Sequence, residues 1–454
     1  MPKLKKFTAF VDTLFPSEVE YVQNNNSYED KDILDILQRI EQRVAEPWKG
    51  IEFDASIDLR KYSKLLASIS KKLKERDVDA YFEWISLTNY HITVDSISPE
   101  QQGRILKEMK SFEIGWFHMD SFYRLVENYV GYLLRRFRHA DYAMVQAFLS
   151  EHRAAVKENS AVENQINELT QIIAFSQRNE LEESQIDWLL FSFKNKELSK
   201  KNRFYALLAY FMYHIGQKKW ESLFEPFEEL EKELFAGDFY SRRILANVYA
   251  NKLIIYNSRG DYERAAYFGY QSVKHHTEDY LYYLNNYVSV LLHLDRGDEA
   301  MKKMQETFPM YKATLDQNRR VVFASNYCRC LNRQQQYAKC AGFATRFLDE
   351  LGSKIFQFKW HYFFRNYFFA QLKIGNTEQM VKLNRNWKLV DREASGKFNP
   401  HIRALMLAAE YREIKLSGEE FFNQFSLLSG NDFAKDNDLV SLMEMIREEL
   451  PQAG

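Results

Sequence analysis

Apolar residues recur at intervals of three and four along nearly the whole chain. In residues 58–74 this spacing places them on one side of a helix, opposite a polar side. The stripe consists of Leu59, Tyr62, Leu65, Leu66, Ile69 and Leu73. The same period returns in most later segments, so the pattern predicts a chain built from helices.

Helix starts are also marked in the first third of the sequence. Ser98 precedes Pro99, and Gln101 stands where its side chain reaches back to complete a capping box. Pro47 and Gly50 mark a connecting loop at 45–56. We expect helices at 3–14, 16–24, 30–44, 58–75, 77–90, 98–112, 119–137 and 141–157.

From about Lys157 the helices are punctuated at regular intervals. The turn residues are Gly216, Gly260, Gly297, Gln335 (in a turn without glycine), Gly375 and Gly418. Successive spacings are 44, 37, 38, 40 and 43 residues. A recurrence of roughly 40 residues with a turn in each unit is typical of a helix-turn-helix solenoid, because one hairpin cannot bury its apolar face alone. An ordinary large helical protein is the alternative.

The turn Gly260-Asp261-Tyr262-Glu263-Arg264-Ala265 resembles the consensus turn of tetratricopeptide repeats, Gly-Asp-Tyr-x-x-Ala. In that family the glycine makes the turn, the tyrosine packs between helices, and the alanine lets them approach closely. Cys340 stands five residues after Gln335 and fits the small-residue role. Met380 and Asn423 depart from the consensus, and the spacing exceeds the family's usual length of about 34 residues.

The expected fold class is therefore all-α, with two parts. Residues 1–156 form a helical N-terminal domain, either an irregular bundle or degenerate repeats. Residues 157–454 form an α-solenoid of tetratricopeptide-like helix-turn-helix repeats.

The resemblance also implies a partner-binding groove on the concave face. In the family's register, groove positions lie 13, 10, 6 and 3 residues before each turn residue. The residues expected there are Arg203, Tyr210, Asn247, Asn257, Tyr287, Arg329, Tyr362, Arg365 and Arg412. This polar and aromatic set carries a basic excess, which suits an acidic peptide segment.

Composition narrows the functional classes. The 62 basic and 63 acidic residues leave a formal net charge of −1, so no overall field favours nucleic acid or an anionic membrane. Glycine (16) and proline (8) are scarce, as expected of long helices. We find no signal peptide and no apolar run of membrane length, and three cysteines do not form a disulfide framework. These features predict a cytoplasmic protein.

Chemical motifs add little. Cys328 and Cys330 point in different directions on a helix, so we interpret the cysteines as small core residues. The adjacent His275 and His276 also diverge, which favours helix-end polarity over a metal or acid-base pair. No phosphate loop, zinc-protease pair or serine elbow is present. We therefore expect no catalytic residue, metal or cofactor.

The sequence thus favours a non-enzymatic scaffold or adaptor that binds a protein or peptide, with no membrane, nucleic-acid or small-molecule partner. Two alternatives remain open. One is a nucleic-acid-binding helical array, and the other is an enzyme whose site lies in the N-terminal region.

Overall fold

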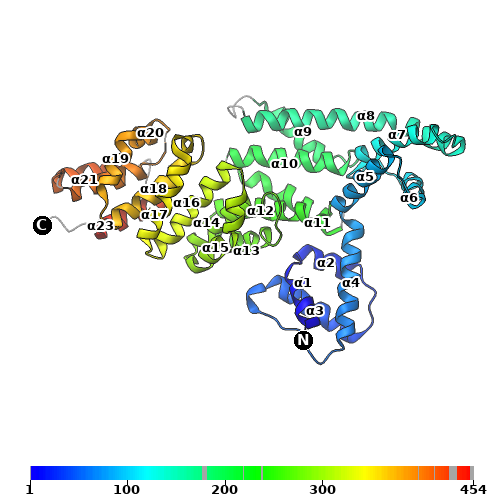
Figure 1. Cartoon of the computed structure of the whole chain (residues 1–454), viewed down its shortest axis with the longest axis horizontal. Helices are drawn as coiled ribbons and strands as arrows, with labels where there is room; N and C mark the ends of the chain where they lie inside the picture. The colour runs from blue at the N-terminus through cyan, green and yellow to red at the C-terminus, as the bar shows by residue number, and fades with distance from the viewer. Residues whose placement is uncertain are drawn as a thin grey trace. The chain divides into compact units, whose positions relative to one another are not determined.

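The computed structural model describes residues 2–175, 181–217, 219–236, 239–396, 398–413, 415–428 and 437–449. Within these ranges every regular element is an α-helix or a short 3₁₀-helix (Figure 1). This confirms the all-α expectation. The chain divides into two compact units, Met1–Val248 and Tyr249–Gly454. The expected domain boundary, between residues 156 and 157, lies inside one helix of the first unit.

Unit 1 contains eleven described α-helices and the first part of a twelfth. Their bounds are α1 (Pro2–Asp12), α2 (Pro16–Asn24), α3 (Lys31–Ala45), α4 (Leu59–Arg76), α5 (Val78–Thr93), α6 (Pro99–Lys110), α7 (Met119–Leu134), α8 (His139–Phe175), α9 (Glu183–Lys194), α10 (Lys200–Gly216), α11 (Phe224–Ala236) and α12 (Arg242–Ser258). Two 3₁₀-helices, η1 (Pro47–Lys49) and η2 (Glu221–Leu223), lie between them.

Helix α6 begins as its residues predict. The Gln101 backbone N–H donates to Ser98 Oγ at 3.2 Å, and the Ser98 N–H donates to Gln101 Oε1 at 3.0 Å. Because the first N–H groups of a helix have no partner within it, this reciprocal pair fixes the start of α6. Helix α8 differs from its expected bounds, since its 37 residues continue well past 157.

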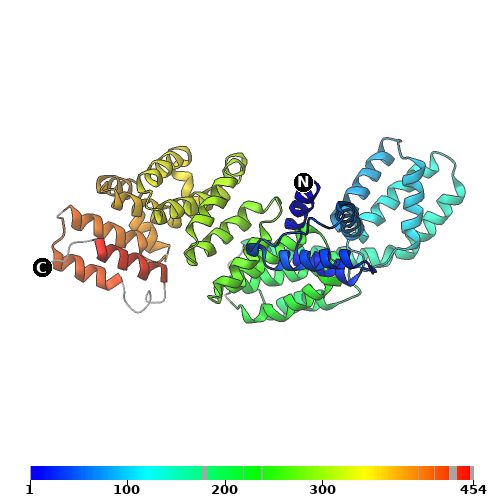
Figure 2. The ribbon, with the colours of Figure 1, turned by 90° about the horizontal axis from the view of Figure 1, so that it is seen from below.

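Unit 2 contains the remaining helices (Figure 1). They are α13 (Tyr262–Ser272), α14 (Tyr280–His293), α15 (Gly297–Ala313), α16 (Gln317–Arg333), α17 (Tyr337–Leu351), η3 (Gly352–Gln357), α18 (Trp360–Lys373), α19 (Thr377–Trp387), α20 (Leu389–Ser395), α21 (His401–Arg412), α22 (Gly418–Leu428) and α23 (Asn437–Glu449). From α13 to α18 each helix contacts the next, and α14, α16, α18 and α21 also contact one another in that order. Helix α23, red in Figure 2, packs against α21.

Four turns between helices of unit 2 share one backbone geometry. Each contains a residue with a left-handed backbone: Gly260 (φ 78°), Asp295 (φ 59°), Gln335 (φ 57°) and Gly375 (φ 76°). The N–H of the following residue donates to the carbonyl five residues earlier, at 2.8 to 3.0 Å in all four turns. This bond pairs a carbonyl that the end of a helix leaves free. Asp295 therefore makes the turn for which the sequence suggested Gly297, and Gly297 begins α15.

The residue five positions after each left-handed residue is fully buried. These residues are Ala265, Ala300, Cys340 and Met380. Three of the four are small, which allows close contact between neighbouring helices. The cysteines Cys328, Cys330 and Cys340 are all buried and unoxidised. Burial raises the pKa of the Cys330 thiol to about 12, so this thiol stays protonated and unreactive at neutral pH.

Candidate functional site

Two adjoining cavities open on helices α14, α16 and α18 of unit 2. One has a volume of about 300 Å³ and the other about 240 Å³. They share the side chains of Arg329, Arg365 and Asn366, so we treat them as one surface, the polar groove. The first cavity is also lined by Asn285, Asn286, Ser289, His293, Val322, Ser325, Asn326, Lys359 and Tyr362. The second is also lined by Asn332, Arg333, Gln335, Tyr337, Phe369, Lys373, Ser441, Leu442 and Met445.

Asparagine side chains tie the helices of the groove together. Asn326 Nδ2 on α16 donates to the backbone oxygen of Asn285 on α14 at 3.0 Å. Asn366 Nδ2 on α18 donates to its own helix at Tyr362 O (2.8 Å) and to Ser325 Oγ on α16 (3.3 Å). Because these groups are buried and bonded, they hold neighbouring helices at fixed separations.

The charge of the groove is one-sided. Its lining includes Arg329, Arg333, Arg365, Lys359 and Lys373, and none of the described lining residues is an aspartate or glutamate. Some of these cations contact aromatic rings, as Lys373 Nζ does at 5.3 Å from the Phe369 ring centre. Arg333 is paired with Asp295, outside the lining, at 3.4 Å. In a chain whose net charge is only −1, the lining is still a local concentration of positive charge, which favours an anionic ligand.

Two polar atoms in the groove have no hydrogen-bond partner in the structure. They are the donor Asn286 Nδ2 and the acceptor Asn332 Oδ1, both inaccessible to solvent. Asn332 is 8% exposed, and its Nδ2 is already used in a 2.8 Å bond to Asn366 O. An unpaired buried polar group costs about 1–3 kcal/mol. Because neither atom is accessible, a ligand in the groove pairs with them only if these side chains rotate.

Three of the residues expected in the groove come together there. Arg329 on α16 lines both cavities, and so does Arg365 on α18, which is 8% exposed. Tyr362 lines the larger cavity and is 51% exposed, with the Arg365 guanidinium 5.4 Å from its ring centre. These side chains present two cations and one aromatic ring to the same space.

Arg203 and Tyr210 lie in unit 1 and are buried inside it. The Arg203 side chain donates to Phe193 O at 2.8 Å and to Glu233 Oε1 at 2.6 Å, which links α9, α10 and α11. The Tyr210 hydroxyl points to Ser222 O at 3.4 Å. Both side chains therefore serve the packing of unit 1.

The other expected residues line neither cavity. Tyr287 is 1% exposed, and its hydroxyl donates to Glu299 Oε1 at 2.7 Å, between α14 and α15. Arg412 donates to Leu372 O on α18. Asn247 and Asn257 are half-buried on α12.

The groove asparagines were missed by sequence reasoning, although a signal for them exists. Asn285 and Asn326 are 41 residues apart, and Asn366 follows at nearly the same interval. Ten residues before Gly297 is Tyr287, whereas ten residues before Asp295 is Asn285. On α14 the groove positions are therefore found by counting back from the left-handed Asp295, and not from the nearby Gly297.

The N-terminal region contains one strongly perturbed histidine. His118 stacks on Tyr81 with ring centres 3.6 Å apart, and neither of its ring nitrogens has a partner in the structure. Burial, with a smaller contribution from the charge of Lys200, lowers the pKa of His118 to about 3. This histidine therefore stays neutral at neutral pH, within a cluster of aromatic rings.

Among the described helices, none has an apolar stretch of sufficient length to span a bilayer. Comparisons of the chain with protein-family models, with curated proteins and with solved structures find no match to any of them.

Proposed function

We propose that this chain is a non-enzymatic scaffold of the tetratricopeptide-like solenoid kind, which binds an extended acidic segment of a protein partner in the polar groove. The observation that carries the proposal is the groove lining, which combines clustered cations with asparagine side chains and has no carboxylate among its described residues. An extended acidic peptide offers partners for both kinds of side chain. Its backbone forms hydrogen bonds with the asparagine amides, and its acidic side chains pair with the arginines.

The repeated turn supports the solenoid part of the proposal. Gly260, Asp295, Gln335 and Gly375 adopt the same left-handed conformation and the same hydrogen bond. Contacts between α14, α16, α18 and α21 place alternate helices in a row, as in stacked helical hairpins. A row of this kind offers equivalent positions to successive residues of one extended ligand.

The size and composition of the groove support a peptide over a compact metabolite. Its two parts extend across α14, α16 and α18 and reach α23, so polar contacts are distributed along the row of helices. Leu442 and Met445 of α23 add an apolar wall to the smaller cavity. A segment with alternating acidic and apolar residues matches this lining.

Binding to short fluorescent peptides tests the proposal directly. The probes are a random acidic library rich in aspartate, glutamate and leucine, and composition-matched basic and neutral libraries. We expect the full chain to bind members of the acidic library, and Arg329→Ala to weaken that binding about tenfold or more, since hydrogen bonds to charged groups contribute about 1.5–3 kcal/mol.

The matched control is Arg385→Ala, which removes an equal charge from an exposed position on α19, outside the groove. It should leave peptide binding unchanged. Equal weakening by Arg329→Ala and Arg385→Ala, or no selectivity for the acidic library, would contradict the proposal.

The basic lining and the half-exposed Tyr362 also resemble a surface on which nucleic-acid bases stack, so oligonucleotides form a second set of probes. Single-stranded DNA and RNA should bind weakly or not at all at moderate salt. Tight oligonucleotide binding that falls steeply with salt and is lost in Arg329→Ala would favour the nucleic-acid function instead.

A further inference from the structure

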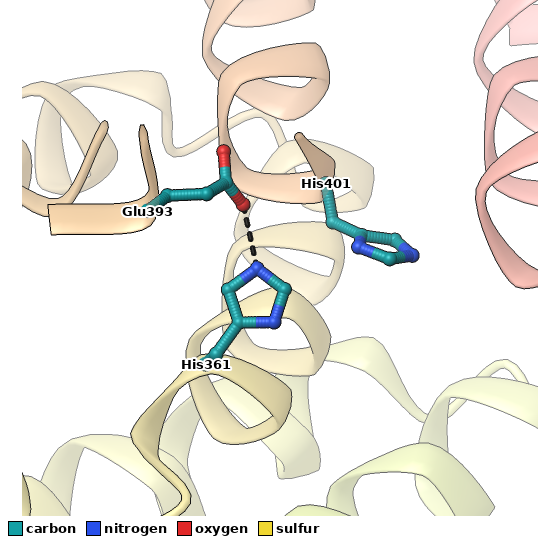
Figure 3. Close-up of side chains that lie close together, drawn as sticks. All are labelled: His361, Glu393 and His401. Atoms are coloured by element: carbon teal, nitrogen blue, oxygen red, sulfur yellow. Dashed lines mark hydrogen bonds and ion pairs between the residues drawn. The ribbon is translucent and has the colours of Figure 1, made fainter. Parts of the chain in front are cut away.

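Beneath the polar groove, three ligating side chains meet in the interior of unit 2. They are His361 on α18, Glu393 on α20 and His401 at the start of α21, and Figure 3 shows that they come from three separate elements, with His361 and Glu393 in direct contact and His401 beside them. Each is at most 4% exposed. Their donor atoms all lie within 4.8 Å of one another, and no other group of this kind occurs in the part of the chain that the structure describes.

Hydrogen bonds from three donors hold the Glu393 carboxyl group in place. Its Oε1 accepts the backbone N–H of Ile402 at 2.7 Å, and its Oε2 accepts that of Arg403 at 2.9 Å. These donors are the first free N–H groups of α21, where the helix dipole favours negative charge. Oε1 also accepts the Nε2–H of His361 at 2.6 Å (Figure 3).

The two imidazole rings are oriented by their surroundings. His361 stacks on Phe398 with ring centres 4.8 Å apart and an angle of 9° between the ring planes. His401 Nδ1 lies 3.2 Å from the backbone oxygen of Asn399, which assigns the ring proton to Nδ1 and leaves the Nε2 lone pair as an acceptor. In the present orientation Nδ1 is the ring nitrogen on the side of Glu393 and His361, and Nε2 points away from them (Figure 3).

A cationic group already occupies the Nε2 lone pair. Arg365 Nη1 lies 3.3 Å from His401 Nε2, a long distance for a hydrogen bond. The guanidinium of Arg365 also lines both cavities of the polar groove. Nε2 thus faces Arg365 and not Glu393, so the His401 ring has to turn before Nε2 reaches an ion in the cluster, and the guanidinium then remains in the groove that it already lines.

From this arrangement we propose that His361, Glu393 and His401 form a binding site for a divalent transition-metal ion, with Zn²⁺ as the best match. Two imidazoles and one carboxylate are a ligand set that proteins use for zinc, with a fourth position left for water or another ligand. A tetrahedral ion at about 2.0–2.1 Å from each ligand holds the ligand atoms roughly 3.3 Å apart. To bind the ion, the His401 ring turns so that Nε2 faces Glu393, and the proton on His361 Nε2, which now bonds Glu393 Oε1, moves to Nδ1 of the same ring.

The first experiment measures Zn²⁺ uptake by chelator-stripped full-length protein, in competition with a chromophoric chelator. We expect one tight site in the wild-type chain, and a rise in Tm of about 5 °C or more at a hundredfold excess of Zn²⁺ over its Kd. His361→Gln and His401→Gln each remove a ligand and should weaken this site at least ~100-fold. Uptake of no tightly bound Zn²⁺ by the wild-type chain would overturn the proposal.

The matched control is His276→Gln, which removes an exposed histidine of the same unit from the adjacent pair His275-His276. It should bind Zn²⁺ as tightly as the wild type. If it abolishes the site, or if both cluster variants fold and retain full affinity, the ion binds elsewhere and the assignment is wrong.

Co²⁺ in place of Zn²⁺ identifies the ligands even if a variant fails to fold. Nitrogen and oxygen ligands in a tetrahedral site give visible d–d absorption without a thiolate charge-transfer band. A thiolate band would assign the ion to Cys328, Cys330 or Cys340 and would overturn the proposal. Metal uptake is measured without any peptide, so its failure leaves the groove proposal untouched.

Discussion

In each unit an asparagine joins two helices and an arginine lies nearby on the same helix, but the surroundings of the two arginines differ. In unit 1, Asn202 Nδ2 donates to Asn159 O at 2.7 Å, and the neighbouring Arg203 is paired with Glu233 in the interior. In unit 2, Asn326 makes the corresponding bond to Asn285 O at 3.0 Å. The arginine that follows on the same helix, Arg329, lines a cavity instead.

The difference lies in the presence of a carboxylate. In unit 1, Glu233 on α11 forms a salt bridge with Arg203. In unit 2, no acidic residue among those described lines the polar groove. One arginine is thus an internal brace, and the other lies at a cavity.

The largest expected effect is on stability when the internal pair is broken. Arg203→Ala leaves the carboxylate of Glu233 buried, with only Lys196 as a partner, and should lower the free energy of unfolding by about 3 kcal/mol. Arg329→Ala, at a half-buried position, should lower it by only about 1 kcal/mol. Urea unfolding followed by circular dichroism measures both, and similar losses in the two variants would erase the distinction between the units.

The second largest expected effect is the loss of stability at low pH that His118 of unit 1 causes. The folded pKa of His118 is about 3, below the usual value of about 6.5, so between these pH values only the unfolded chain binds the proton. The contribution of His118 is complete above pH 6.5 and falls as the pH drops, by about 2 kcal/mol between pH 6.5 and 5.

Replacing His118 with phenylalanine removes this proton while keeping a ring in the aromatic cluster. The free energy of unfolding of His118→Phe should therefore fall less on acidification than that of the wild type, by about 2 kcal/mol at pH 5. Parallel pH profiles for the two proteins would show that His118 is hydrated and titrates normally.

The smallest expected effect on stability concerns the left-handed turn, a feature that both units contain. Phe137 in unit 1 and Gln335 in unit 2 both have left-handed backbones (φ 54° and 57°) and the same bond from the next residue to the carbonyl five positions earlier. Because glycine adopts this conformation without strain, Phe137→Gly and Gln335→Gly should each raise the free energy of unfolding by about 0.5 kcal/mol. Gly260→Ala should lower it by about 1 kcal/mol. Thermal melting checks all three, and destabilisation by both glycines would mean that the turns are held by their side chains.

The helices were predictable because their signals are local. Ser98 and Gln101 form the capping box that their spacing indicates, and the turn at Gln335 was placed by spacing alone, without a glycine. Helix α8 was predicted too short, since no breaker marks its middle and the pattern at 157 suggested a new unit.

The face of a helix on which a residue lies was harder to predict, because one residue of register turns a side chain by about 100°. Arg329, Tyr362 and Arg365 were placed together since Gln335 and Gly375 are the true turn residues. Tyr287 was counted from Gly297, two residues beyond the left-handed Asp295, and it lies between α14 and α15. Arg203 pairs with Glu233, which lies on another helix, and a single sequence does not reveal that pairing.

The asparagine bonds between helices have a consequence for how a ligand is received. Asn326 and Asn366 anchor α16 to α14 and α18 to α16, so the width of the groove is set before anything enters it. Preorganisation of this kind reduces the entropy lost on association, because little of the receiving surface has to be ordered. Free and occupied forms of the groove should accordingly have nearly the same backbone, and selectivity should depend on the fit of the incoming chain to a template of preset dimensions.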